Sequence, residues 1–361
     1  MYLSVTKSDA SASASASASS KSKSSVKIIS DKLNNKPNLP FVERFRPNTL
    51  DGIMSHKETI RILKNYITLH NIPHLLFYGP PGTGKTSTID AFVNELYGKE
   101  NVDYMTMNIN ASEERGIEIV RNKIKNFVST SPIHPGKPGS PGYKFVILDE
   151  ADMMTPDAQG MLKQVIEYYT DNARFCLICN CNKKINAAIQ SRCTVFNFPP
   201  LDYDSVRKKI DMVATEFDLV VTDDGINTLW KLSNGDMRKV LHMLQVISIN
   251  NKVIDSERIT NFKNYPTTLE MDLMYRTLLE SDLKKSINYM TNIIKEKHYS
   301  LCDILTELTY RVNNSIIRKE MDFVKGAELI GDMRDIEMNL IVTADTNIQM
   351  MSIISVFRGR T

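Results

Sequence analysis

The sequence predicts an α/β domain in which helices flank a parallel sheet, followed by a small helical domain and a C-terminal all-helical domain. Between residues 39 and 201, short apolar runs alternate with helical patterns, which is typical of a parallel α/β sheet. After Pro199 and Pro200 the strand patterns nearly vanish and helical periodicity dominates. A length of 361 residues agrees with several domains, because one core normally stops growing before that size.

Residues 1–38 are predicted to form a disordered tail. They consist largely of Ser, Ala, Lys and Asn, with a Ser-Ala repeat, and contain too few large apolar side chains to offset the entropy of ordering. They hold six of the 45 basic and two of the 42 acidic residues, so the remainder is almost neutral. A nucleic acid would therefore have to meet a local surface and not a global positive field.

The bulk properties exclude a membrane protein. No stretch approaches the ~18 uninterrupted apolar residues of a membrane span, and the N-terminal segment has no apolar core of a secretory signal. We therefore expect a soluble, intracellular chain without a membrane partner. Its five cysteines are expected to stay reduced, because disulfides are rare in that setting.

Three of these cysteines lie in FCLICNC, which raises the question of a metal site. On an extended strand Cys176 and Cys179 would point to opposite faces, so we interpret them as buried strand residues and not as zinc ligands.

The α/β domain, residues 39–201, contains five apolar runs that predict strands: HLLFY, YMTMNI, FVILD, RFCLIC and TVFNF. After the second run, residues 113–128 predict a helix with one apolar face, made by Ile117, Val120, Ile124 and Phe127. Residues 131–143 are so rich in Pro and Gly that they predict a surface loop.

Two helical domains follow. Residues 202–263 read as short helices, with apolar side chains in step at Val206, Ile210, Val213 and Phe217. Residues 264–361 show longer helical patterns, for example at Leu301, Ile304, Leu305, Leu308 and Val312.

The segment GPPGTGKTS, residues 79–87, predicts a phosphate-binding loop between the strand HLLFY and a helix. Its backbone N–H groups can turn toward one anion, and the helix N-terminus adds its positive end. Lys85 is expected to meet the β- and γ-phosphates of ATP, and Thr86 to ligate Mg²⁺. The predicted nucleotide contacts in this loop are Gly79, Pro80, Pro81, Gly82, Thr83, Gly84, Lys85, Thr86 and Ser87.

The segment VILDEADMM, residues 146–154, carries the letters DEAD of a large helicase class. Downstream of a phosphate loop, however, Asp149 fits a Mg²⁺ ligand, partly through water, and Glu150 fits the residue that activates the attacking water. A helicase of that class would also need a second sheet domain, whereas this chain turns helical after residue 201. Ala151 and Asp152 are interpreted as the turn into the next helix.

With these two motifs and Asn180 at the end of the strand RFCLICN, the chain resembles the AAA+ ATPases, in which such an Asn contacts the γ-phosphate or the water. Narrower motifs are VERFRP (42–47), NASEERGIEIVRNKIKNF (110–127), DEADMMTPDAQ, RFCLICN, QSRCTVFNF (190–198) and SNGDMRKVL (233–241). In these motifs the chain resembles the small subunits of replication factor C, which are sliding-clamp loaders.

The resemblance implies further roles. Val42 and Arg46 would border the adenine pocket, and Arg238 would close a helical lid domain, residues 202–263, over the phosphates. Arg192 would be an arginine finger that reaches the ATP site of the neighbouring subunit, where such a cation stabilises transition-state charge. The alternative is a salt-bridged arginine before an edge strand, but the match of the Ser-Arg-Cys triplet and of its setting favours the finger.

The resemblance also implies DNA contact, at Ser112, Arg115, Arg121 and Lys125. In the family such helices follow the DNA backbone, which suits phosphate contacts without base reading. The alternative is an ordinary charged helix face, in which Glu118 pairs with Arg121.

The sequence departs from the family where an Asn-Ala-Leu-Arg-Arg segment is usual and this chain has Gly160-Met161-Leu162-Lys163-Gln164. The second arginine is absent, so any coupling that it provides is missing here.

Taken together, the resemblance implies an ATPase that is weak alone and acts in a hetero-oligomeric, pentameric ring of AAA+ subunits held by a C-terminal collar, residues 264–361. The ring would load a sliding clamp onto primer–template DNA, in the nucleus of a eukaryotic cell or at the replication site of a virus. Two alternatives stay open: another AAA+ DNA motor, such as a branch-migration ATPase, and a scaffold subunit that does not hydrolyse ATP.

Overall fold

The computed structural model describes residues 39–113, 116–130, 142–342 and 345–360. The chain forms two compact units: one comprises the chain up to Val213 together with Ser233–Val246, and the other comprises Ala214–Leu232 and Ile247–Thr361. Residues 202–263, expected to be one helical domain, contribute to both units, and the division of the chain into three folded domains stays a prediction. The expected tail and most of the expected Pro/Gly loop lie outside the described residues.

The first unit is built on a five-stranded parallel sheet with the order β2-β3-β4-β1-β5. Its strands are β1 (His74–Tyr78), β2 (Thr106–Asn110), β3 (Lys144–Asp149), β4 (Ala173–Cys179) and β5 (Cys193–Asn197). Each of the five apolar runs became one of these strands, and all pair in parallel. The predicted α/β class of this domain is therefore confirmed.

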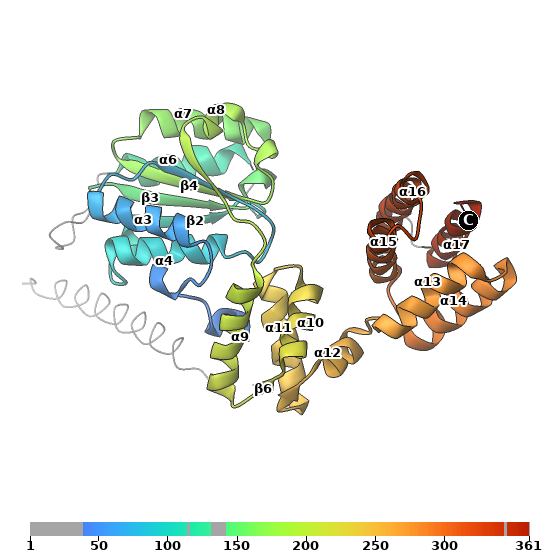
Figure 1. Cartoon of the computed structure of the whole chain (residues 1–361). Helices are drawn as coiled ribbons and strands as arrows, with labels where there is room; N and C mark the ends of the chain where they lie inside the picture. Colours follow the sequence, from blue (N-terminus) through green and yellow to red (C-terminus); the bar gives the residue numbers. More distant parts are fainter. Residues whose placement is uncertain (1–38, 114–115, 131–141, 343–344, 361) are drawn as a thin grey trace, which may run out of the picture. The chain divides into compact units, whose positions relative to one another are not determined.

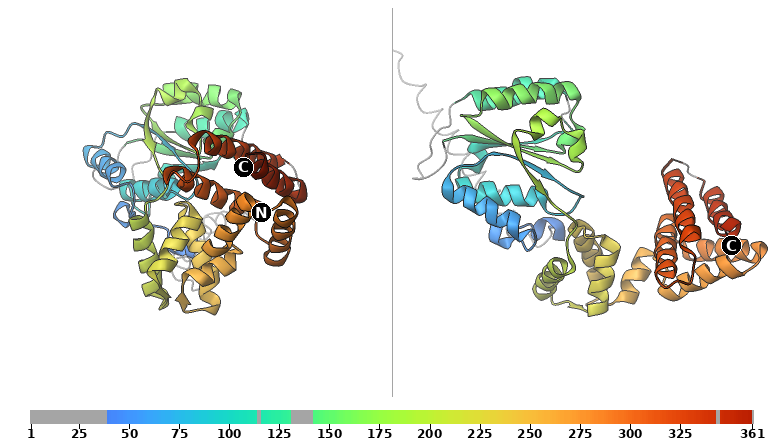
Figure 2. Two further views of the ribbon diagram at one scale, coloured as in Figure 1. Left: turned by 45° about the vertical axis from the view of Figure 1, so that its right-hand side comes forward. Right: turned by 45° about the horizontal axis from the view of Figure 1, so that its top comes forward.

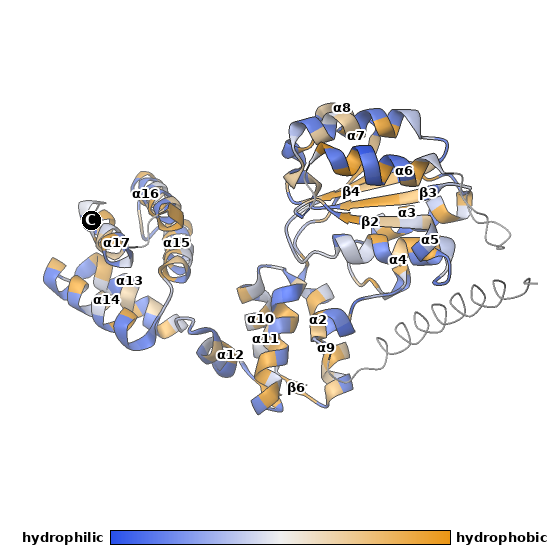
Figure 3. Cartoon of the chain, turned by 180° about the vertical axis from the view of Figure 1, so that it is seen from behind, coloured by the Kyte–Doolittle hydropathy of each residue, from blue (hydrophilic) through white to orange (hydrophobic). Residues whose placement is uncertain are grey.

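Helices cover both faces of the sheet, as Figures 1 and 2 show. One face carries α3 (Lys57–Leu69) and α4 (Lys85–Tyr97). The other carries the π-helical η2 (Ile119–Ile124), α6 (Lys125–Ser129) and α7 (Pro156–Tyr168). Figure 3 shows β3 and β4 as hydrophobic ribbons between these two layers, which is the expected pattern for strands buried on both faces.

Strand β4 illustrates how the two cores divide. Cys176 and Ile178 pack in the core beneath α4, whereas Leu177 and Cys179 pack in the core beneath α7. Successive side chains of a strand point to opposite faces. Both cysteines are buried strand residues, as predicted, and they lie in different cores.

The predicted helix 113–128 needs a correction. Residues 111–113 form a turn, in which Ser112 Oγ donates to Asn110 Oδ1 at 2.8 Å, and the helix begins only after Gly116. Ser112 therefore lies in this turn and not at the start of the helix. The helix then winds with π geometry through η2, so that Ile119 and Ile124, five residues apart, are both buried. A regular period of 3.6 residues per turn does not place Ile119 on the apolar face, so its burial was not predicted from the sequence.

Shorter elements connect these layers. They are α2 (Phe41–Arg44), η1 (Leu50–Gly52), α5 (Val102–Met105), η3 (Ala151–Met153), η4 (Asn182–Lys184) and α8 (Ala187–Gln190). Helix α7 has a clear start, because the side chain of Thr155 accepts the Ala158 N–H and Pro156 occupies the first helical turn. Helices α9 (Tyr203–Phe217) and α11 (Met237–Asn250) each have residues in both units.

The second unit is almost entirely helical. Its elements are α10 (Asp223–Ser233), α12 (Ser256–Lys263), α13 (Thr268–Glu280), α14 (Leu283–Lys297), α15 (Leu301–Ile317), α16 (Phe323–Val342) and α17 (Thr346–Arg360). Helices α13 to α17 enclose one apolar core, to which α15 contributes the predicted stripe from Leu301 to Val312. A two-stranded parallel ladder, β6 (Val220–Val221) with β7 (Val253–Ile254), was not predicted, because two residues are too short for a periodic signal.

A buried carboxylate joins α10 to α15 within the second unit. Glu307 accepts from Lys231 Nζ at 2.6 Å, from the Tyr265 hydroxyl at 2.8 Å and from Arg311 at 2.6 Å. These donors hold the pKa of Glu307 below its usual value although burial opposes that shift. No helix among the described residues is long and apolar enough to cross a membrane.

His74, at the start of β1, should make the free energy of unfolding depend on pH. His74 is buried and its Nδ1 accepts the Phe175 N–H at 3.2 Å, while burial and the Arg174 cation lower its pKa to about 4. An unfolded histidine titrates near 6.5, so between these values the unfolded state binds the extra proton. Folding stability should therefore fall by about 2 kcal/mol from pH 7 to pH 5 on account of this side chain.

Urea unfolding of the full chain at several pH values measures this effect. His74→Asn keeps an acceptor but does not titrate, so its stability should vary less with pH, whereas His70→Asn, at an exposed position, should behave like the wild type. Equal pH slopes for wild type and His74→Asn would contradict the assignment.

Candidate functional site

A cavity of about 330 Å³ opens at the carboxyl ends of the central strands of the first unit. A volume of this size is typical of small-molecule sites. The structure brings most of the sequence-predicted residues to its wall: Val42, Arg46, Pro81, Gly82, Thr83, Gly84, Lys85, Thr86, Ser87, Asp149, Glu150, Asn180 and Arg238.

The loop between β1 and α4 has a backbone that only glycine accommodates easily. Gly79, Gly82 and Gly84 have φ values of +150°, +71° and +94°. Gly79 also lies against the end of β5, where a Cβ atom would approach the Phe198 carbonyl oxygen to 2.1 Å. The loop is thus fitted closely to the neighbouring strand, with its turns set by glycine.

The start of α11 is docked on this loop. The Met237 N–H donates to the Gly82 carbonyl at 3.1 Å, and the Asp236 carboxylate occupies the space that a Cβ atom on Gly82 would need. Asp236 also caps α11 by accepting the Arg238 N–H at 2.9 Å. These contacts hold Arg238 at the wall of the cavity.

Lys85 is a buried cation of the cavity wall. Its Nζ donates to the carbonyls of Gly79 and Pro80, at 2.7 and 2.8 Å, and to Asn180 Oδ1 at 3.3 Å. Burial lowers its pKa, the Asp149 carboxylate opposes this and the Arg238 guanidinium adds to it. Gly79 and Pro80 therefore contribute through their carbonyls, which orient Lys85.

Two oxygen-bearing side chains meet where the start of α4 faces the end of β3. Thr86 Oγ1 donates to Asp149 Oδ2 at 2.9 Å, and the other Asp149 oxygen accepts the Glu150 N–H at 2.9 Å. A hydroxyl next to a carboxylate is a donor set that suits Mg²⁺. Glu150 adopts a left-handed conformation with φ +52°, which costs a non-glycine residue energy and is common at functional sites.

Several residues around the cavity were not predicted from the sequence. His56 contacts the Thr83 carbonyl through Nε2 at 3.1 Å and packs edge-on against Phe198, and burial lowers its pKa. Asp90, also not predicted, forms an ion pair with the predicted Arg46 at 3.5 Å. Ser205 and Lys209 of α9 also line the cavity. They carry no recognisable motif, and only the fold brings α9 to this place.

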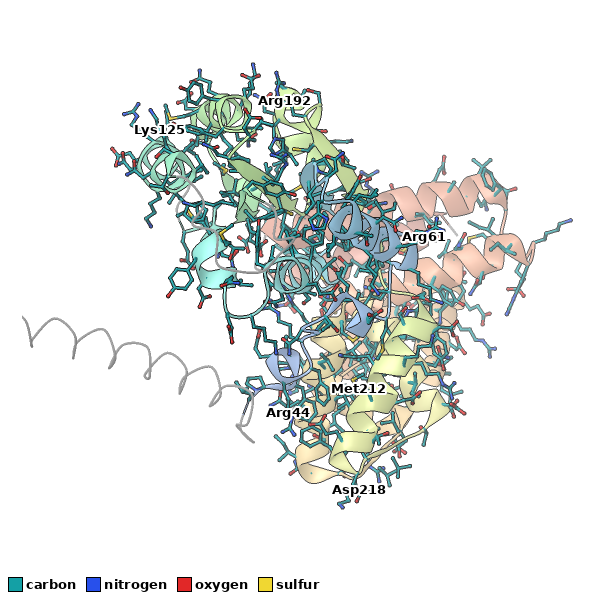
Figure 4. All side chains as sticks on the ribbon, turned by 90° about the vertical axis from the view of Figure 1, so that its left-hand side faces the viewer. Arg44, Arg61, Lys125, Arg192, Met212 and Asp218 are labelled. Atoms are coloured by element: carbon teal, nitrogen blue, oxygen red, sulfur yellow. The ribbon has the colours of Figure 1, made fainter. Side chains whose placement is uncertain are left out.

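Arg192, the expected finger, does not line the cavity of its own chain. It follows α8, where its guanidinium pairs with Glu167 of α7 and donates to the Ala188 carbonyl at 2.8 Å. Its side chain is 38% exposed, so it can be reached from outside. Figure 4 shows Arg192 and Lys125 in the part of the unit that α6, α7 and α8 build.

The expected DNA-contacting residues are placed only in part. Arg121 and Lys125 are exposed on η2 and α6, one turn apart, and Glu118 forms no ion pair with Arg121 among the described residues. Ser112 lies in the turn before the helix. Arg115 lies outside the described residues.

Comparison with known families agrees with this site. Residues 75–201 match the model of the ATPase family associated with various cellular activities (AAA). The fold and the cavity thus define an AAA ATPase. Residues 266–356 match the model of the replication factor C C-terminal domain.

Curated relatives cover almost the whole chain. Replication factor C subunit 5 of Homo sapiens is 39% identical over 89% of this chain and 92% of its own length. Replication factor C subunit 3 of Saccharomyces cerevisiae is 36% identical, with 91% and 96% covered, and subunit 3 of Schizosaccharomyces pombe is 42% identical, with 76% and 78% covered. The chain belongs to the replication factor C family, so the predicted resemblance is confirmed.

Among solved structures, a RuvB mutant of Thermotoga maritima has a TM-score of 0.50 at 14% identity, covering 70% of this chain and 88% of its own. At that identity the likeness shows the fold alone. The relatives named above therefore favour a replication factor C subunit over the branch-migration alternative.

The contact between α11 and the loop predicts unequal effects at two glycines. Gly82→Ala and Gly84→Ala should each lower the free energy of unfolding by roughly 1 kcal/mol, because both positions have positive φ. Gly82→Ala should lose about 1 to 3 kcal/mol more, because its Cβ atom would displace Asp236, whereas nothing lies within 4 Å of a Cβ atom at Gly84. Urea unfolding of both variants compares them directly, and equal losses would show that the Asp236 contact contributes nothing.

Proposed function

We propose that this chain is an ATP-hydrolysing subunit of a hetero-oligomeric, pentameric ring that loads a sliding clamp onto primer–template DNA. The observation that carries the proposal is one cavity lined by a full set of phosphate, metal and water-orienting side chains, in a chain of the replication factor C family. The set comprises Lys85, Thr86, Asp149, Glu150, Asn180 and Arg238.

Each of these side chains has a defined task. Lys85 and Arg238 place positive charge where the γ-phosphate would lie, and Asn180, already bonded to Lys85, is placed to contact the same group. Glu150 would orient or deprotonate the attacking water. A Mg²⁺ ion held by Thr86 and Asp149 would offset charge on the phosphates. Val42 and Arg46 would border the base.

Arg192 is proposed to act on the neighbouring subunit. It cannot serve the cavity of its own chain, since it does not line that cavity, and its exposed guanidinium sits at the outer side of α7 and α8. A planar cation that enters another subunit's site would stabilise transition-state charge there. The isolated chain should therefore hydrolyse ATP slowly.

DNA contact is proposed for Ser112, Arg115, Arg121 and Lys125. Exposed cations one turn apart suit successive phosphates and need not read bases. We expect the chain to act where its host replicates DNA, in the nucleus of a eukaryotic cell or at a viral replication site.

Two substitutions separate hydrolysis in the chain's own site from help to the neighbour. In the complex assembled with the native partners, Glu150→Gln should bind ATP normally but slow hydrolysis in its own site by about 10²-fold or more, because the water loses its base. Arg192→Ala should leave the chain's own nucleotide affinity unchanged and slow hydrolysis in the adjacent site by about 10³-fold.

Single-turnover hydrolysis and nucleotide affinity together measure both effects. Unchanged hydrolysis in Glu150→Gln would favour the non-hydrolysing scaffold. Appreciable ATPase activity of a strictly monomeric chain that Arg192→Ala abolishes would contradict a finger that acts on the neighbour.

The DNA proposal predicts a change in salt dependence. Replacing Arg121 and Lys125 by Ala in the assembled complex should make the negative slope of log affinity against log salt shallower by about 2, because each phosphate contact contributes roughly 1. Lys57→Ala with Lys99→Ala removes the same charge from exposed positions elsewhere and should change the slope less. Equal slopes for the two double variants would exclude direct phosphate contact by Arg121 and Lys125.

A further inference from the structure

Arg192 is held by groups of its own chain on two sides. Its Nη1 donates to the Ala188 carbonyl at 2.8 Å, one turn back along the chain, and its Nη2 pairs with Glu167 Oε1 of α7. Its backbone N–H donates to the Ile189 carbonyl at 3.0 Å, which fixes the base of the side chain on α8. The guanidinium therefore has a defined direction, although the side chain is partly exposed.

Glu167 makes few other contacts. Its one further ion pair among the described residues is with Lys163, which lies one turn earlier on α7 and 3.9 Å from the same Glu167 oxygen. An exposed pair of this kind contributes little to the stability of a helix. Helix α7 is fixed independently by the Thr155 cap and the buried Gln159. Removal of the Glu167 carboxylate should therefore leave the fold in place and change chiefly the surroundings of Arg192.

The two side-chain contacts of Arg192 leave part of its guanidinium for another molecule. An arginine carries five N–H donors in a planar fork. One is used on the Ala188 carbonyl and one on the Glu167 carboxylate, and the other three have no partner in the part of the chain that the structure describes. The contacts thus orient the fork without using all of its donors.

The strength of the ion pair decides whether Glu167 orients Arg192 or restrains it. The side chains of Arg192 and Glu167 are 38% and 39% exposed, so water screens their attraction. Exposed pairs typically change an equilibrium by about fivefold or less. A triphosphate carries several negative charges and attracts a guanidinium more strongly than one screened carboxylate does. Glu167 can therefore favour one direction of the Arg192 side chain, but it cannot withhold Arg192 from a phosphate.

We propose that Glu167 is a positioning residue for Arg192, which it holds in the direction from which the guanidinium enters the ATP site of the neighbouring subunit. This inference rests on the proposed function, in which Arg192 acts on that site. A free arginine loses rotamer freedom when it reaches a phosphate, and an ion pair that limits this freedom beforehand lowers the barrier. Glu167 does not touch the nucleotide and acts only through Arg192.

Single-turnover hydrolysis in the adjacent site of the assembled complex tests the proposal. Glu167→Ala should slow this step by about fivefold, far less than Arg192→Ala does, and should leave the ATP affinity of the adjacent site unchanged. Glu167→Gln keeps an acceptor on a side chain of the same length, so its rate should lie between those of the Ala variant and the wild type. Asp171→Ala removes an exposed carboxylate just after α7 and should keep the wild-type rate.

A double-mutant cycle separates positioning from a general structural role. Because Glu167 acts through Arg192, adding Glu167→Ala to Arg192→Ala should not slow hydrolysis further. A further fivefold loss (about the single-variant effect) in the double variant, or a wild-type or faster rate in Glu167→Ala alone, would overturn the inference. A wild-type rate in Arg192→Ala would instead contradict the proposed action of Arg192 on the neighbour, and with it that part of the proposed function.

Discussion

The strand order β3-β4-β1 is the constraint on which the site depends. In a parallel sheet the carboxyl ends of all strands lie at one edge, and this order places the ends of β3, β4 and β1 side by side there. Asp149 leaves β3, Asn180 follows β4 and the loop that holds Lys85 follows β1. The hydrogen bonds from Lys85 to Asn180 and from Thr86 to Asp149 are consequences of that order. Residues nearly a hundred positions apart meet because their strands are neighbours.

The remaining walls of the cavity come from parts of the chain that have no place in the sheet. The Asp236 carboxylate, just before α11, packs against Gly82. Helix α9 donates hydrogen bonds to the carbonyls of Phe45 and Met54. A nucleotide in this cavity would therefore touch the sheet edge, the N-terminal segment and two later helices at once. Such an arrangement can make the relative position of these segments depend on what the cavity holds, which is what the proposed function requires.

Helix α7 connects the two ends of the proposed chemistry within one chain. It starts just beyond Glu150 and ends beside the ion pair of Glu167 with Arg192. In its first turn the buried Gln159 donates to the Lys184 carbonyl and accepts the Asn186 N–H, at 3.1 and 2.7 Å, which fixes the helix to the segment that leads to α8. The arginine that the family carries at position 164 is a glutamine here, and Lys163, its neighbour, lies 3.9 Å from Glu167. Helix α7, packed by a buried amide, can thus relate the carboxylate that is proposed to orient water to the exposed guanidinium.

The sequence by itself determined the strands, the glycine-rich loop after β1, the two carboxylates after β3 and the family, because apolar runs and glycine-rich turns are local properties of the chain. It also predicted the apolar stripe of α15, since a regular helix keeps its period. Only the tertiary structure decided the late start and π winding of the helix after β2. Packing on the sheet buries Ile119 more fully than Ile117, and a local pattern does not predict which of the two is buried. Tertiary structure likewise decided that His56, Asp236, Ser205 and Lys209 belong to the site. Their positions follow from packing between distant segments, and packing leaves no periodic mark in the sequence.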